Sequence, residues 1–251
     1  MKLKDLLLSV RNALFPQNFT CDICGAEIFD GGRFCPACKK TVQFNDKTFC
    51  PVCGRRTERA EICAECKAFA PRYKKGVSAL IYSGGGTQLV LKFKRGAKYL
   101  KDYFGQLLQE KAKLLPACDC ITYVPITAKR KRQRGYNQGE LLAEELSARL
   151  KIPVAHALTK KRETSDQKIL TMKERAENLH ACFAIADRDS VKGKRVLLVD
   201  DVLTTGATAD EVCRELQIAG AKEIYFMTVA SVEYKPFSRQ KSDSANVQEK
   251  E

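Results

Sequence analysis

Residues 195–208 read Arg-Val-Leu-Leu-Val-Asp-Asp-Val-Leu-Thr-Thr-Gly-Ala-Thr, and this stretch decides the fold class. The apolar run Val196–Val199 predicts a buried strand, which Asp200 and Asp201 follow directly. Strand ends of a parallel sheet face the crevice where ligands bind. The turn Thr204–Thr208 offers hydroxyls and backbone N–H groups at a helix start, where a phosphate is favoured. Because paired carboxylates accept hydrogen bonds from sugar hydroxyls, the best-matched ligand is a phosphorylated ribose.

The residues after this turn predict a complete β-turn-α-β unit. Thr208 and Glu211 have the spacing of a capping box, which predicts that a helix begins at Thr208. Gly220 is a C-terminal stop signal, and residues 222–229 then predict the next strand. Such a unit is typical of a doubly wound α/β sheet.

Eight of the twelve cysteines form four Cys-x-x-Cys pairs near the N-terminus. In a reducing compartment such pairs predict metal sites, and four thiolates suit one tetrahedral Zn²⁺. Gaps of ten and nine residues inside the sets favour two successive zinc ribbons, while interleaved pairing stays an alternative. The predicted ligands are Cys21, Cys24, Cys35 and Cys38 for one site, and Cys50, Cys53, Cys63 and Cys66 for the other.

The chain divides into four predicted segments. Residues 1–18 carry a short amphipathic helix, and residues 19–70 form a double zinc ribbon that depends on metal to fold. Residues 71–234 form the α/β domain, and residues 235–251 are a polar tail predicted to be disordered. The absence of a secretory signal and of a long apolar stretch predicts a cytoplasmic protein without a membrane span.

The net charge of +14 is concentrated in segments without acidic residues. No Asp or Glu occurs from Lys67 to Lys101 or from Cys120 to Gly139. Such a field attracts polyanions, here pyrophosphate, nucleic acid or both, although a solvated face is the alternative. Tyr136 could stack on a base or be buried under the following helix. The candidate nucleic-acid ligands are Lys129, Arg130, Lys131, Arg132, Arg134 and Tyr136.

Several short motifs follow one another along the chain. The Cys-x-x-Cys pairs come first, then Arg134-Gly-Tyr-Asn-Gln138 after a Val-Pro loop, then Arg162-x-Thr164-x-x-Gln167 and Arg175-x-x-Asn178. Residues 195–208 resemble the 5-phosphoribosyl-1-pyrophosphate (PRPP) signature of type I phosphoribosyltransferases. In this order the motifs resemble the ComF family of competence proteins. The resemblance implies a type I phosphoribosyltransferase-like parallel sheet with helices on both faces, preceded by a small double zinc-ribbon module.

The resemblance also implies site residues and partners. In phosphoribosyltransferases the loop after the first core strand holds the pyrophosphate, and residues 124–127 follow the predicted strand 119–124. The family acts in single-stranded DNA uptake during natural transformation, in the cytoplasm, beside a DNA-translocating ATPase. The implied PRPP ligands are Asp200, Asp201, Thr204, Thr205, Gly206, Ala207, Thr208, Thr127 and Lys129.

Two functions of different classes follow from these residues. The first is a DNA-handling protein that binds PRPP and acts in single-stranded DNA uptake. The alternative is an enzyme that transfers phosphoribosyl from PRPP to a base or amine. In the enzyme, Asp200 and Asp201 would be the catalytic residues, and Mg²⁺ would neutralise the pyrophosphate.

Overall fold

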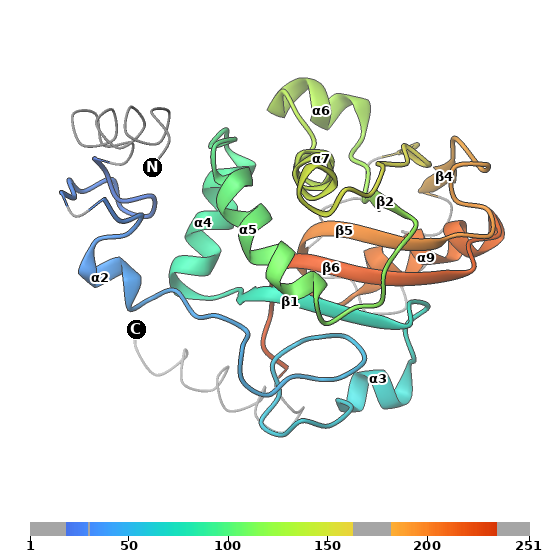
Figure 1. Cartoon of the computed structure of the whole chain (residues 1–251), viewed down its shortest axis with the longest axis horizontal. Helices are drawn as coiled ribbons and strands as arrows, with labels where there is room; N and C mark the ends of the chain where they lie inside the picture. The colour runs from blue at the N-terminus through green and yellow to red at the C-terminus, as the bar shows by residue number, and fades with distance from the viewer. Residues whose placement is uncertain (1–18, 30, 163–181, 235–251) are drawn as a thin grey trace, which may run out of the picture.

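The structure is a computed structural model that describes residues 19–29, 31–162 and 182–234 (Figure 1). The predicted N-terminal helix, the motifs between residues 164 and 178 and the polar tail lie outside the described residues. Two short helices belong to the cysteine-rich segment, α2 (Pro36–Lys39) and α3 (Ala64–Ala68). The helices of the α/β domain are α4 (Gly84–Lys94), α5 (Leu100–Ala112), α6 (Ala128–Arg134), α7 (Gln138–Leu150) and α9 (Ala207–Ile218).

The core of the domain is a four-stranded sheet in which every pair of neighbours is parallel. Its strands lie in the order β1-β6-β5-β2. Such a sheet is buried on both faces, which explains why its strands are almost continuously apolar. Its strands are β1 (Lys75–Ile81), β6 (Glu223–Ser231), β5 (Arg195–Leu203) and β2 (Cys120–Tyr123). A separate antiparallel pair consists of β3 (Leu158–Lys160) and β4 (Phe183–Ile185).

Successive residues of β5 divide the core between the two faces of the sheet. Leu197 and Val199 pack in one cluster with apolar residues of α4, α5 and α7. Val196 and Leu198 pack in the other cluster with α9 and the second set of cysteines. Helices therefore cover both faces, as the sequence predicts.

The start of α9 corrects one sequence expectation. The helix begins at Ala207, and its N-cap is Gly206 with a φ of 84° and no side-chain capping bond. The predicted capping box from Thr208 is wrong, because the Glu211 carboxylate instead accepts hydrogen bonds from Arg214 at 2.9 and 3.1 Å. The left-handed conformation at Gly206 turns the chain one residue earlier than the capping pattern indicates.

The segment between the two sets of cysteines adds to the outer edge of β1. Phe44 forms an antiparallel bridge with Leu80. The Asn45 N–H donates to the Ala79 carbonyl at 2.9 Å, and the Ile81 N–H donates to the Gln43 carbonyl at 2.8 Å. The cysteine-rich module is thereby joined to the sheet by backbone hydrogen bonds.

Within the described ranges, we find no helix with the length and apolar character that crossing a bilayer requires.

Candidate functional site

The eight paired cysteines gather into two clusters of four. The sulfur atoms within each cluster all lie within 4.8 Å of one another. Cys24 Sγ lies 3.8 Å from Cys35 Sγ, and Cys53 Sγ lies 3.9 Å from Cys63 Sγ. Four thiolates about 2.3 Å from a tetrahedral Zn²⁺ lie about 3.8 Å apart, so both clusters fit the ion. The successive pairing is confirmed, and the interleaved alternative is not formed.

The two clusters differ in how deeply they lie in the molecule. All four cysteines of the second cluster are buried, whereas Cys24 of the first is exposed. The second cluster also contacts the α/β backbone, since the Gly76 N–H donates to the Val52 carbonyl at 2.7 Å. A Cβ on Gly54, whose φ is 75°, would lie 2.5 Å from the Gly76 carbonyl oxygen. Only glycine allows this close approach.

The acidic pair lies at the carboxyl-terminal end of β5. The Asp201 N–H donates to Asp200 Oδ1 at 2.8 Å, and Lys94 Nζ from α4 lies 2.9 Å from Asp201 Oδ1. Burial, and then the neighbouring Asp201 charge, raises the pKa of Asp200 to about 7, although Lys94 and Lys160 oppose the shift. The sequence did not identify Lys94 as a residue of this site, although its position in an acid-free segment was an indication.

The turn after β5 has exposed threonines beside a helix start. Thr204 and Thr205 are exposed, and Thr205 Oγ1 accepts from the Ala207 N–H at 3.4 Å. Gly206 and Thr208 are half-buried. The turn therefore presents hydroxyls and a helix N-terminus together, which is the chemistry that binds a phosphate.

Arg55 of the second cluster contacts the same turn. Its side chain is buried, its Nη1 donates to the Thr204 carbonyl at 3.4 Å, and its Nε donates to Cys53 Sγ at 3.5 Å. The guanidinium also pairs with Glu65. A cavity of about 210 Å³ between the cluster and the turn is lined by Arg55, Leu203 and Asp210 among others. The Arg55-Arg56 pair after a Cys-x-x-Cys motif gave no sequence signal for this contact.

The loop before α6 lies at the same edge of the sheet as the acidic pair. Tyr123 is in register with Val199, so the loop after β2 begins level with Asp200. Thr127 is buried, and its hydroxyl accepts from the Arg130 N–H at 3.2 Å as the N-cap of α6. Lys129, two residues later, is exposed.

The basic side chains of α6 have different surroundings. Lys131 Nζ pairs with the Glu140 carboxylate at 2.7 Å, and Arg134 Nη1 donates to Gln138 Oε1 at 3.2 Å. Arg132 is exposed, and its Nε donates to the helix backbone at Ala128 at 3.4 Å. Of the predicted basic ligands, Lys129, Lys131 and Arg132 are exposed, while Arg130 and Arg134 are half-buried.

Tyr136 corrects the expectation that it stacks on a base. Its exposed fraction is 5%, and its hydroxyl donates to the Phe93 carbonyl and accepts from the Gly96 N–H at 3.0 Å. The ring is therefore buried, which is the alternative that the sequence left open. Its contacts hold the turn after α6 against the loop between α4 and α5. Lys98 Nζ lies 4.8 Å from the ring centre, which joins the two acid-free segments on one surface.

Two family models match the chain. Residues 10–67 match the double zinc ribbon domain, and residues 137–249 match the phosphoribosyl transferase domain. The chain is 30% identical to Competence protein F of Haemophilus influenzae, over 82% of this chain and 94% of that protein. It is 31% identical to the DNA utilization protein YhgH of Escherichia coli K12, over 76% and 86%. Competence protein ComFC of Bacillus subtilis is 26% identical, over 70% and 74%.

Proposed function

Because the chain belongs to the ComF family of competence proteins, we propose that it binds PRPP and acts in single-stranded DNA uptake during natural transformation. One observation carries the proposal: the acidic pair, the Thr204–Thr208 turn and the loop before basic helix α6 lie at one edge of the sheet. By family resemblance, the protein works in the cytoplasm and its protein partner is a DNA-translocating ATPase.

In the proposed PRPP site, each element binds one part of the ligand. Asp200 and Asp201 accept hydrogen bonds from the ribose hydroxyls, and Thr204–Thr208 bind the 5′-phosphate through N–H groups and hydroxyls. The loop at Thr127 and the Lys129 ammonium bind the pyrophosphate. Carboxylate oxygens and phosphates are the ligands that Mg²⁺ takes, so these residues fit the ion. When bound, Mg²⁺ would supply positive charge against the pyrophosphate.

PRPP affinity is expected to fall when the pH is lowered from about 8 to about 6. The pKa of Asp200 is raised to about 7, so lowering the pH protonates the free site, while ribose hydroxyls need the ionised carboxylate. When a group with this pKa must be ionised for binding, lowering the pH by these two units weakens the affinity up to about tenfold. Calorimetry across this range, in buffers of different ionisation enthalpy, also measures the proton released. Asp200→Asn should show only the pH dependence of the ligand, and an identical profile in both proteins would contradict this assignment.

The DNA part of the proposal rests on one basic surface, which consists of the loop between α4 and α5 together with α6. Lys98 lies against Tyr136, and exposed Lys129 and Arg132 follow on α6. The Lys94–Asp201 ion pair places the acidic pair beside α4, one of the elements of this surface. DNA phosphates and the pyrophosphate would therefore use neighbouring cations, so PRPP is expected to compete with DNA.

Affinity for single-stranded DNA is expected to fall with salt, with a log–log slope of about −0.7 for each phosphate contacted. Replacing the four consecutive basic residues of α6 should flatten that slope and weaken binding to all sequences alike. The measurement is a fluorescence anisotropy titration of a labelled oligonucleotide at several salt concentrations. The variant replaces Lys129, Arg130, Lys131 and Arg132 with alanine.

A control variant removes the same charge from distant exposed positions. It replaces Lys47, Arg59, Lys192 and Lys222 with alanine. Because these residues do not belong to α6 or to the loop before α5, its slope should stay close to that of the wild type. If the wild type shows no salt-sensitive binding at low ionic strength, the DNA role is wrong.

One specific observation favours the transferase alternative: the complete acidic pair and the phosphate turn both lie at the end of β5. In that reaction the bond from the anomeric carbon to pyrophosphate breaks and a bond to an acceptor nitrogen forms. Pyrophosphate leaves with the electron pair, and the acceptor loses a proton. An assay of PRPP consumption and pyrophosphate release against common bases and amines, with and without single-stranded DNA, tests this alternative.

A further inference from the structure

The loop between α4 and α5 carries an exposed aromatic ring among basic side chains. Tyr99 is 56% exposed, and Arg95, Lys98 and Lys101 are its basic neighbours in the acid-free segment. We propose that the Tyr99 ring stacks on an unpaired base of single-stranded DNA whose phosphates lie along these basic side chains and α6. This inference rests on the DNA role proposed above, and it gives that role the stacking residue that buried Tyr136 does not supply.

The Tyr99 side chain lies near charged residues of the first zinc ribbon. Burial, and then the charge of the neighbouring Asp22 carboxylate, raises the pKa of Tyr99, although Arg33 opposes the shift. Asp22 in turn pairs with Arg33 Nη1 at 3.3 Å. A tyrosine side chain has only two rotatable χ angles, so it loses little conformational entropy when a base stacks on it.

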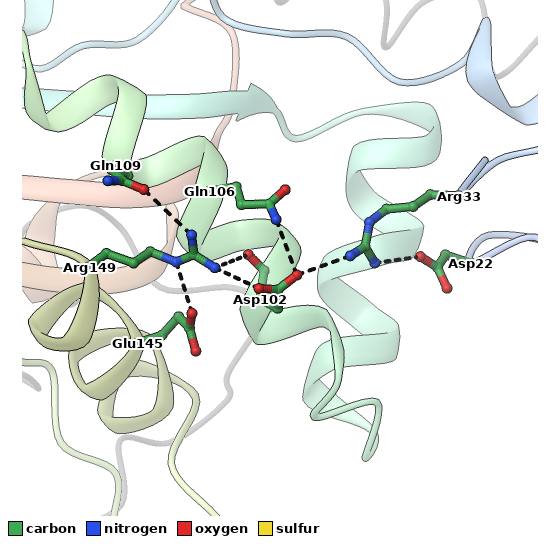
Figure 2. A network of polar contacts seen from close by, with 7 residues as sticks. All are labelled: Asp22, Arg33, Asp102, Gln106, Gln109, Glu145 and Arg149. Carbon is green, nitrogen blue, oxygen red and sulfur yellow. Dashed lines mark hydrogen bonds and ion pairs between the residues drawn. The ribbon is translucent and has the colours of Figure 1, made fainter. Parts of the chain in front are cut away.

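The network in Figure 2 joins the first ribbon to α5 and α7, the helices next to the Tyr99 loop. Arg33 bridges Asp22 to Asp102 of α5, with 3.2 Å between Arg33 Nη2 and Asp102 Oδ2. Arg149 of α7 reaches the same carboxylate from the other side, with 2.6 Å between its Nη2 and Asp102 Oδ1. Arg33 and Arg149 pair with Asp22 and Asp102, and Lys101 Nζ lies 3.9 Å from the Glu145 carboxylate, so the three acids are matched by three cations. Arg95 and Lys98 then supply the basic field near Tyr99.

The buried Tyr136 places the basic residues of both acid-free segments beside the exposed ring. Tyr136 follows Gly135, the C-cap of α6, and its hydroxyl contacts backbone atoms of Phe93 and Gly96. Residues 93–101 therefore lie beside the end of α6, and both occupy the upper part of Figure 1. Basic side chains that contact phosphates and an aromatic ring that stacks on a base are the two elements by which proteins bind single strands without sequence preference.

The test compares Tyr99→Leu with Tyr99→Phe. Both variants lose the hydroxyl, and both keep an apolar side chain, but only phenylalanine keeps a flat ring. The probes are a labelled oligothymidine, the same length of abasic oligonucleotide and the matching duplex. We expect Tyr99→Leu to bind oligothymidine at least about fivefold more weakly than Tyr99→Phe does. The abasic affinity and the salt slope should be equal in the two variants.

A second exposed aromatic provides the matched control. Phe69 is 73% exposed and directly follows α3 in the chain, and Figure 1 shows α3 and α6 on opposite sides of the sheet. Phe69→Ala should leave oligothymidine binding unchanged. Zinc content and thermal unfolding of each Tyr99 variant show whether the first ribbon is intact.

Two results would overturn the inference. Equal oligothymidine affinity in Tyr99→Leu and Tyr99→Phe would mean that the ring does not stack. An equal loss on the abasic strand would mean that Tyr99 acts only through the shape of the basic surface. A wild type that binds no single strand would instead refute the DNA role itself, so the two failures are distinguishable.

Discussion

Cys53→Ser is expected to lower the zinc content from about two ions per chain to about one and to destabilise the whole α/β domain. The buried cysteines of the second cluster share a core with residues of β5, β6 and α9. Tyr73, which follows this cluster, packs its ring 5.2 Å from that of Phe226 in β6. Loss of the second ion therefore also disturbs the packing of the sheet. Elemental analysis and urea unfolding measure the two effects.

Matched variants separate the metal from the simple loss of a thiol. Cys38→Ser should also release one ion, but with a smaller fall in the free energy of unfolding, because Cys38 is only half-buried. Cys213→Ser replaces a buried thiol of α9 outside both clusters and should leave two ions bound. Equal destabilisation by Cys38→Ser and Cys53→Ser would contradict the shared core of the second cluster.

Replacing both Asp200 and Asp201 with asparagine is expected to weaken PRPP binding at least about tenfold, with little change in the fold. A hydrogen bond to a charged group contributes about 1.5–3 kcal/mol, and the variant removes the charge from both acceptors. Inorganic phosphate should bind the variant at least as well as the wild type, because the carboxylates repel a phosphate that has no ribose hydroxyls. Calorimetry with both ligands distinguishes these effects.

The control for this variant lies at the opposite end of the same sheet. Asp119 accepts from the Arg195 N–H at 2.7 Å, at the start of β5 rather than at its end. Asp119→Asn should leave the PRPP affinity unchanged. Unchanged PRPP affinity in the double variant would show that the sugar phosphate binds elsewhere.

The features that the sequence predicted correctly depend on local patterns of residues. The spacing of the cysteines determines which thiolates can reach one ion, and the apolar run before Asp200 determines a strand with both faces buried. Both follow from residues close together in the chain. The start of α9 was missed by one residue, because glycine at position 206 adopts a conformation that the capping pattern does not encode.

The features that the sequence did not predict depend on contacts between distant segments. Burial of Tyr136 follows from its bonds to Phe93 and Gly96, about forty residues earlier in the chain. Arg55 reaches the Thr204 carbonyl across 149 positions, and Lys94 meets Asp201 only because α4 packs on the sheet. A single sequence does not show which distant residues come into contact. The basic and acidic residues could therefore be identified, but their partners could not.

The pairing of residues 43–45 with β1 covers an edge strand of the sheet, so the zinc module protects the domain against aggregation. An uncovered edge strand presents unpaired N–H and C=O groups on which another chain can add. Here the backbone of Gln43 and Asn45 hydrogen-bonds to such groups of β1. Both residues lie in the short span between the two metal clusters. A chain that lacks metal would free this span and leave an apolar parallel sheet with an open edge. Recombinant protein made under zinc limitation, or a fragment that begins at residue 71, should therefore form insoluble assemblies before it loses its secondary structure.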